Sequence, residues 1–395
     1  MGKESLSWLD ATGMITATTI GAGILALPIA LYPFGTLGAA LLLLAAAGLS
    51  LAASLLITEA LMRTDHQAHF PALVDRHLGP WGCALVTASL AAYIYGALAA
   101  YVISGGALLE AWSGGAVPNW AGEIIYFAAL ALVVYGGMGV VKRAEEASSL
   151  AIAALALLIS ALALPHFAMA QGSAGAAAIP GVFGLVLFAF FGHSIIPSLR
   201  MRMGRDWRGL LRALLLGTAL VAVIYIAWTT AIAGAVPGGL LAAAGASGQP
   251  ATIPLGAVVG PVAILLGGIF ALFSTGSSYV GSCFSLVDIF RDEFHELHRR
   301  IGKGAALMLS ALPPLALALL MPHGFVKVLE LAGLYGGGIA IGVVAPITYL
   351  AARRHGRREP EFSIPAPLGE ILASLLLGVT LAMLIYETWS LLSGA

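Results

Sequence analysis

The sequence contains little charge and almost no cysteine. Only 10% of its 395 residues are charged, whereas soluble domains carry about 25%. Two cysteines, Cys83 and Cys283, both in apolar stretches, exclude a disulfide framework. The formal net charge of zero indicates no nucleic-acid partner. The sequence has no Gly-x-x-x-x-Gly-Lys-Ser/Thr motif, which argues against an ATP-driven pump.

Long apolar runs fill most of the chain. Hydrophobic residues make up 60% of it, and the mean hydropathy is +0.97, so the composition indicates an integral membrane protein. A bilayer-spanning helix needs about 20 mostly apolar residues. The first apolar run is too long for a cleavable signal, and we interpret it as the first span. Eleven spans are predicted, near residues 8–34, 37–62, 81–112, 121–140, 147–170, 180–200, 208–234, 256–290, 304–321, 326–351 and 367–393.

The distribution of basic residues supports this count. If the N-terminus is cytoplasmic and the spans alternate, every Lys and Arg except Lys327 falls on the cytoplasmic side. Such an asymmetry is the sequence signature of membrane orientation. An odd number of spans then predicts an external C-terminus.

Two spans carry matching interruptions. The first contains "GILALP" (Gly23 to Pro28) and the sixth contains "GHSIIP" (Gly192 to Pro197). Both read Gly, four residues, Pro, and paired interruptions at corresponding positions indicate the binding site of a secondary transporter. A broken helix is tolerated in lipid where its freed backbone is buried in protein or lines a cavity. We therefore predict inverted repeats over 1–175 and 176–358, with an additional helix in 359–395.

Several stretches carry a family resemblance. "TTIGAGILALPIA", "FFGHSIIPSL", "YGALAAYVISGG", "VIYIAWTTAIAGAVP" and "LELAGLYGGGIAIGVVAPI" resemble the bacterial hydroxy and aromatic amino acid permeases, in the amino acid/auxin permease group of the amino acid–polyamine–cation (APC) superfamily. The family usually has Phe-Gly-Phe-His in the sixth span, whereas this chain has Phe190-Phe191-Gly192-His193.

The resemblance implies a fold and an activity. The fold is an all-α polytopic membrane protein with eleven helices, a leucine-transporter-like five-plus-five inverted repeat with helices 1 and 6 broken, and an extra helix 11. The activity is proton-coupled amino acid import across the inner membrane, for aromatic or neutral substrates, without a cofactor. The implied partners are an amino acid, a proton or sodium ion, and the bilayer.

The first break supplies the groups that an amino acid needs. Half-helix N-termini present free N–H groups to a carboxylate, and Ala22, Gly23 and Ile24 are expected to provide them. Carbonyls from Ala17 to Ile20 suit an ammonium or a cation. Tyr95 is favoured over Tyr101 because it lies nearer the membrane midplane by residue count. The candidate substrate-binding residues are Thr19, Ile20, Gly21, Ala22, Gly23, Ile24, Tyr95, Phe190, Phe191, Gly192, His193, Ser194 and Ser278.

Two coupling ions remain open. His193 is an ionisable residue inside a span, so it either carries a proton or holds the broken helix by hydrogen bonds. Glu330 is a second candidate proton carrier. The sodium alternative places the ion between the carbonyls of Ala17 and Ile20 and the hydroxyls of Ser277 and Ser278, because hard cations prefer oxygen ligands.

A different class of function is an intramembrane enzyme. A serine protease needs a Ser with a His or Lys base across the bundle. The stretch "STGSS" (Ser274 to Ser278) with His193 is the one such pairing, and it lacks a typical flanking pattern. Secondary transport is therefore favoured.

Overall fold

The computed structural model describes residues 6–64, 69–136, 138–204, 206–296, 302–356 and 358–393, and all regular elements in these ranges are helical. The first half contains α1 (Trp8–Thr19), α2 (Gly23–Leu31), η1 (Tyr32–Phe34), α3 (Gly35–Met62), α4 (Phe70–Trp112), α5 (Asn119–Gly136), α6 (Met138–Ala163) and η2 (Leu164–His166). The second half contains η3 (Ala176–Ala178), α7 (Pro180–Ala189), η4 (His193–Ile195), α8 (Ile196–Met203), α9 (Trp207–Ala235), α10 (Gly238–Ala246), α11 (Thr252–Val259), α12 (Pro261–Glu296), α13 (Lys303–Leu320), α14 (Phe325–Leu331), η5 (Ala332–Val344), α15 (Ala345–His355) and α16 (Ala366–Ser393).

Within the described ranges, nine runs of helix are long and apolar enough to cross a membrane. One of them, Gly23–Met62, joins α2 to α3, because the break before Gly23 leaves α1 with 12 residues and α2 with 9. Neither half reaches the roughly 20 residues that a span needs. The count of eleven therefore stays a prediction. The loop Arg291 to Lys303, which carries much of the charge asymmetry, lies partly outside the described residues.

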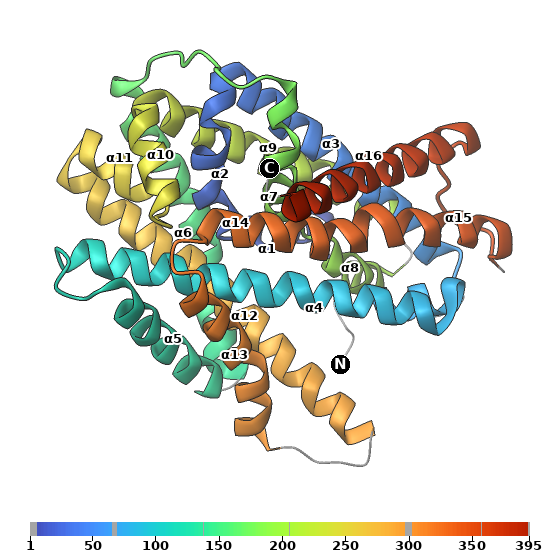
Figure 1. The fold of residues 1–395 in the computed structure, drawn as a ribbon. Helices are drawn as coiled ribbons and strands as arrows, with labels where there is room; N and C mark the ends of the chain where they lie inside the picture. Colours follow the sequence, from blue (N-terminus) through green and yellow to red (C-terminus); the bar gives the residue numbers. More distant parts are fainter. Residues whose placement is uncertain are drawn as a thin grey trace.

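α4 and the α14–η5–α15 run lie side by side through the middle of the molecule (Figure 1). η5 is a π-helix, and its glycines allow close contact with neighbouring backbones. A Cβ at Gly336 would lie 2.6 Å from the Cα of Tyr93 in α4. At Gly333 a Cβ would collide with the carbonyl of Gly184 in α7. Because these contacts need the absence of a side chain, the glycines let η5 lie close to both α4 and α7.

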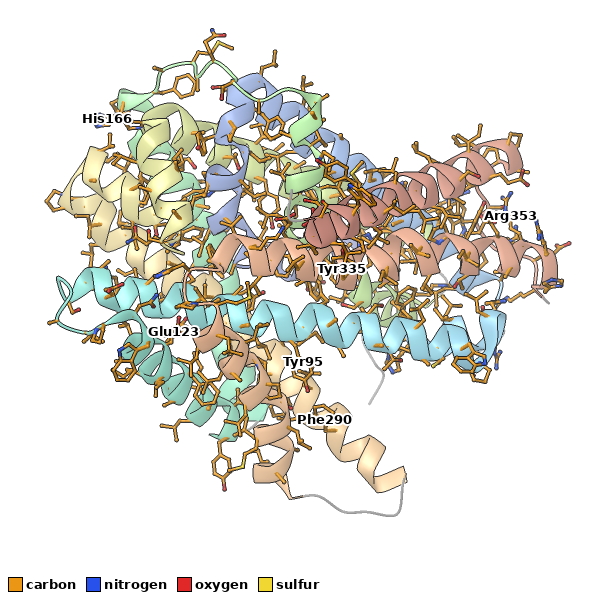
Figure 2. All side chains as sticks on the ribbon, in the orientation of Figure 1. Tyr95, Glu123, His166, Phe290, Tyr335 and Arg353 are labelled. Atoms are coloured by element: carbon orange, nitrogen blue, oxygen red, sulfur yellow. The ribbon has the colours of Figure 1, made fainter. Side chains whose placement is uncertain are left out.

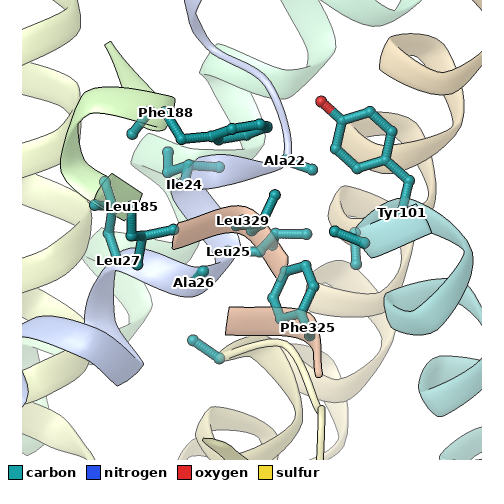
Figure 3. Packing of buried hydrophobic residues seen from close by; sticks show 14 of the residues in the cluster. Ala22, Ile24, Leu25, Ala26, Leu27, Tyr101, Leu185, Phe188, Phe325 and Leu329 are labelled. Carbon is teal, nitrogen blue, oxygen red and sulfur yellow. The ribbon is translucent and has the colours of Figure 1, made fainter. Parts of the chain in front are cut away.

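The larger apolar core surrounds the two helix breaks. Ile24 and Leu25 of α2 are fully buried, and they pack with Leu185 of α7 and Phe325 of α14 (Figure 3). α2 buries eight of its nine residues, whereas α16 exposes large side chains such as Leu392. α2 is therefore an interior half-helix, and α16 lies at the periphery.

A buried carboxylate organises one end of the bundle, the end that the sequence analysis assigns to the cytoplasm. Glu59 of α3 is fully buried and accepts hydrogen bonds from Arg63 at 2.7 Å, Arg353 at 2.9 Å and the Ile364 amide at 2.7 Å. Arg353 is at the end of α15, and Figure 2 shows it at the edge of the bundle. Glu59 thereby links α3, α15 and the segment before α16.

Candidate functional site

Both predicted breaks are present in the structure. α1 ends at Thr19, and Ile20 leaves helical geometry with a ψ of 88° before α2 begins at Gly23. α7 ends at Ala189, and regular α-helix resumes at Ile196 after the short 3-10 turn η4. The Gly and Pro signals in the sequence therefore marked both interruptions.

The two breaks lie directly against each other. A Cβ on Gly23 would lie 3.1 Å from the Cα of Ala189 and 3.2 Å from Cδ1 of Phe188. A Cβ on Gly192 would collide with the Thr19 hydroxyl. Real Cβ contacts of this length are rare because carbon atoms prefer separations of about 3.5–4.0 Å. Glycine at both positions therefore allows the ends of α1, α2 and α7 to meet.

One expectation about free amides is corrected. The Ile24 amide donates to the Gly21 carbonyl at 3.3 Å, so it is not free, because the first turn of α2 is tightened. The Gly21 amide likewise donates to the Thr19 carbonyl at 2.9 Å. Among the backbone bonds of the described residues, none uses the amides of Ala22 or Gly23. These two N–H groups remain as donors at the start of α2.

Hydroxyl groups from two other helices meet the first break at Gly21. A Cβ on Gly21 would lie 3.3 Å from Oγ of Ser278 in α12 and 3.9 Å from the hydroxyl of Tyr101 in α4. Gly21 and Ser278 keep accessible surface, whereas Tyr101 is buried. Figure 3 shows Tyr101 beside the link that contains Ala22. Two hydroxyls and two amides therefore surround this part of the chain.

Tyr95 lies elsewhere. Its hydroxyl donates to the Leu309 carbonyl at 3.0 Å, on the side of α4 that faces α13 (Figure 2). Tyr95 and Tyr101 are six residues apart and point about 120° apart around the helix. The structure thus brings Tyr101 to the break in place of the tyrosine that residue counting favoured.

The hydroxyls of "STGSS" face different neighbours. Ser277 donates to the Phe273 carbonyl of its own helix at 2.6 Å, and Thr275 pairs with the Tyr126 hydroxyl of α5 at 2.6 Å. Ser274 is fully buried without a partner among the described atoms. Ser274, Ser277 and Ser278 share one face of α12 because they are three and four residues apart, whereas Thr275 points about 100° from Ser274. Of the four, Ser278 is the one adjacent to Gly21.

His193 joins the second break to α3. Its Nε2 lies 2.9 Å from the Ser50 carbonyl, and the ring is 2% exposed. Because a carbonyl only accepts, Nε2 carries the proton and Nδ1 is left as an acceptor, without a partner among the described atoms. His193, Thr19, Ser54 and Thr218 line a small cavity with room for about one water molecule.

The phenylalanines of the second break face opposite directions. Phe190 packs edge-on against Tyr225 of α9 at 5.2 Å between ring centroids. Phe191 packs against Tyr93 of α4 at 4.2 Å. Both phenylalanines are buried, whereas Ser194 is exposed. Phe191 therefore belongs to the α4 side of the break, and Phe190 to the α9 side.

Glu330 is buried beside a shared cation. The Lys327 ammonium lies 3.3 Å from Glu330 and 2.6 Å from Glu387 of α16. Both carboxylates are buried, and the single ammonium of Lys327 forms an ion pair with each of them. This cluster connects α14 to α16.

The sequence analysis did not single out three buried polar residues. Tyr225 and Trp228 of α9 are fully buried and hydrogen-bonded to backbone carbonyls at the breaks. Glu123 of α5 is fully buried against Gly106 of α4, and its carboxylate has no partner among the described atoms (Figure 2). The spacing of Tyr225 and Trp228, three residues apart on one helix face, was a usable signal for the first two.

Known proteins resemble this chain over most of its length. The model of the tryptophan/tyrosine permease family matches residues 4–389. The tyrosine-specific transport system 1 of Haemophilus influenzae is 27% identical, over 88% of this chain and 89% of its own. The tyrosine permease of Enterobacter agglomerans is 25% identical, over 95% and 94%.

Other matches are shorter or purely structural. The tryptophan-specific transport protein of Haemophilus influenzae is 32% identical over 38% of this chain, and the match spans 36% of that protein's length. The crystal structure of MhsT in complex with L-phenylalanine superposes with a TM-score of 0.60 at 14% identity, over 96% of this chain and 98% of that one. This likeness confirms the leucine-transporter-like fold. The chain belongs to the tryptophan/tyrosine permease family.

Proposed function

We propose that this protein is a secondary active transporter that imports aromatic amino acids by proton symport. The observation that carries the proposal is the meeting of two broken helices beside hydroxyl groups in the middle of a membrane bundle. Relatives over nearly the whole chain are named as a tyrosine permease and a tyrosine-specific transport system. All of the similar curated proteins are named as transport proteins or permeases, so the chain is a carrier and not an enzyme.

In this proposal the amino acid binds at Gly21. Its carboxylate accepts hydrogen bonds from the amides of Ala22 and Gly23, because the start of a half-helix carries partial positive charge. Tyr101 and Ser278 supply hydroxyls next to Gly21. The ammonium lies toward the carbonyl of Ile20 at the end of α1. Alternating access then exposes this site to one side of the membrane at a time.

His193 is the proposed proton carrier. In its neutral form Nε2 donates to Ser50, and the unpartnered Nδ1 is available to accept a proton beside the small cavity. A charged imidazolium inside a membrane is costly, and a substrate carboxylate nearby reduces that cost. Proton and amino acid therefore favour each other's binding. Ser277, a proposed sodium ligand in the alternative, already donates to its own helix.

The proposed orientation places the N-terminus in the cytoplasm and the C-terminus outside, in the inner membrane. The inverted halves 1–175 and 176–358 form the transport unit, and 359–395 adds a peripheral helix. These assignments rest on the basic-residue asymmetry and on the matched breaks.

Uptake into proteoliposomes tests the proposal. Labelled tryptophan, tyrosine and phenylalanine are supplied with an inward pH gradient without sodium, or with an inward sodium gradient at equal pH. We expect concentrative uptake of at least one amino acid with the pH gradient alone. Accumulation that requires sodium, and is lost in Ser277→Ala, would contradict proton symport and favour sodium coupling.

The His193→Gln variant tests the carrier residue. We expect it to lose accumulation driven by the pH gradient while retaining exchange of labelled for unlabelled substrate, because the site remains but the proton has no acceptor. His166→Gln is the matched control, since His166 is exposed in η2. Accumulation by His193→Gln equal to that of His166→Gln would refute this role.

A further inference from the structure

One tyrosine hydroxyl connects the two helix breaks. Tyr225 of α9 is fully buried, and its hydroxyl lies 2.8 Å from the Thr19 carbonyl and 2.9 Å from the Ala189 carbonyl. Thr19 is the last residue of α1, and Ala189 is the last residue of α7. One atom from a third helix thus lies between the carboxyl-terminal ends of both interrupted helices.

These two ends need a donor. Carboxyl-terminal helix ends carry partial negative charge, and carbonyls that leave a helix lose their intrahelical partners. The Thr19 carbonyl also receives the Gly21 amide at 2.9 Å. No backbone bond recorded between described residues reaches the Ala189 carbonyl, so the Tyr225 proton is its donor. The one hydroxyl proton is shared between the two carbonyls as a three-centre hydrogen bond, and it therefore holds two like-charged helix ends together.

α9 holds the next half-helix as well. Trp228 lies three residues after Tyr225 and donates its Nε1 hydrogen to the Ile24 carbonyl in α2 at 2.8 Å. Ala189 is also the residue that lies next to Gly23, since a Cβ on Gly23 would lie 3.1 Å from the Ala189 Cα. The end of α1, the end of α7 and the start of α2 are all positioned from one face of α9.

We infer that Tyr225 is a positioning residue for the transported amino acid, since its hydroxyl sets the distance between the two breaks. The inference rests on the proposed function, because it takes the breaks as the amino acid site. Tyr225 acts through Thr19 and Ala189 and need not touch the substrate. Preorganised backbone groups raise affinity because little conformational entropy is lost in ordering them when the ligand binds.

The test compares two buried tyrosines. Tyr225→Phe keeps the ring that packs against Phe190 and removes the bridging hydroxyl. Tyr279→Phe is the matched control, because Tyr279 is fully buried and its hydroxyl pairs with Cys283 of its own helix. Equilibrium binding of labelled tryptophan, tyrosine and phenylalanine to purified protein in detergent gives Kd, and the melting temperature is measured in parallel.

We expect Kd to rise roughly three- to tenfold in Tyr225→Phe and to stay unchanged in Tyr279→Phe. Replacement of Tyr225 by 4-aminophenylalanine, which has two N–H donors for the two carbonyls, should restore the wild-type Kd. This variant also carries the test if Tyr225→Phe does not fold.

Two outcomes would overturn the inference. A lower melting temperature in Tyr225→Phe with an unchanged Kd would show that the hydroxyl only stabilises the fold. A 4-aminophenylalanine variant that folds but binds at least about tenfold more weakly than wild type would show that donors at this position do not set affinity. Wild-type protein that binds none of the three amino acids would instead overturn the proposed function.

Discussion

Substitution of Gly23 is the most direct probe of the contact between the breaks. An added methyl group would lie 3.1 Å from Cα and 3.2 Å from Cβ of Ala189, and 3.2 Å from Cδ1 of Phe188. Because carbon atoms prefer about 3.5–4.0 Å, the start of α2 and the end of α7 must separate by a few tenths of an ångström in Gly23→Ala. Two of these neighbours are backbone or Cβ atoms, so no flexible side-chain end can relieve the contact.

The expected cost falls on binding. Overpacking costs about 1–3 kcal/mol, which corresponds to a Kd raised about 5- to 150-fold if the bound state needs the closed arrangement. The intrinsic gain of up to about 1 kcal/mol from Gly to Ala in a helix offsets part of the cost to folding. We therefore expect Gly23→Ala to keep a melting temperature close to wild type while losing affinity. Gly23→Leu should abolish binding.

The assay is equilibrium binding of labelled aromatic amino acids in detergent, with Gly48→Ala as the matched control. Gly48 lies within α3, is exposed, and has no atom within 4 Å of an added Cβ. It therefore gains the same helix propensity without the contact. A Kd for Gly23→Ala within about twofold of the Gly48→Ala value would refute the reasoning that the two breaks must touch for binding.

Three further predictions concern orientation and buried charge. In a protein without native cysteines, Gly175→Cys should react with an impermeant maleimide in intact cells, because residue 175 is expected outside. Glu359→Cys should react only after permeabilisation, because residue 359 is expected in the cytoplasm. The reverse labelling pattern would contradict the proposed topology. Glu59→Gln should lower the free energy of unfolding by about 3–5 kcal/mol, because the fully buried Glu59 carboxylate pairs with two mostly covered arginines, Arg63 and Arg353. The partly exposed Glu361→Gln should cost about 0–1 kcal/mol. Equal melting temperatures for these two variants would contradict the role of Glu59. Lys327→Met should destabilise by less, about 1–3 kcal/mol, because the Lys327 side chain is 41% exposed while the two carboxylates are buried; removal of one of these carboxylates should restore part of the melting temperature.

Local features of the sequence were sufficient for the broad architecture. Apolar run length is a property of neighbouring residues, so it located the membrane helices. The breaks at Gly21 to Gly23 and at Gly192 also followed from local chemistry, because Gly and Pro weaken a helix wherever they occur. The family followed from short motifs around the same breaks, and the family model matches residues 4–389.

Side-chain direction and partners were decided by the tertiary structure. Residue counting favoured Tyr95, but the rotation of the two side chains about α4 brings the hydroxyl of Tyr101 to Gly21 and that of Tyr95 to Leu309. The Ile24 amide looked free from the helix break alone, and a tightened first turn pairs it with Gly21. Each residue turns a helix by about 100°, so a small difference in position changes which neighbour a side chain meets.

Tyr225 shows most clearly the difference between what local sequence predicts and what tertiary contacts decide. Its sequence context, "VIYIAW", carries part of the family resemblance and puts Tyr225 and Trp228 on one helix face, but it does not show which atoms they contact. Its importance comes from two carbonyls that lie 206 and 36 residues away along the chain. The apolar composition therefore determined that this is a membrane protein, and the local Gly and Pro motifs determined that two of its helices are interrupted, because both are local properties of the chain. The packing of α9 against both interruptions determined which hydroxyl joins them, because that contact exists only after distant segments meet.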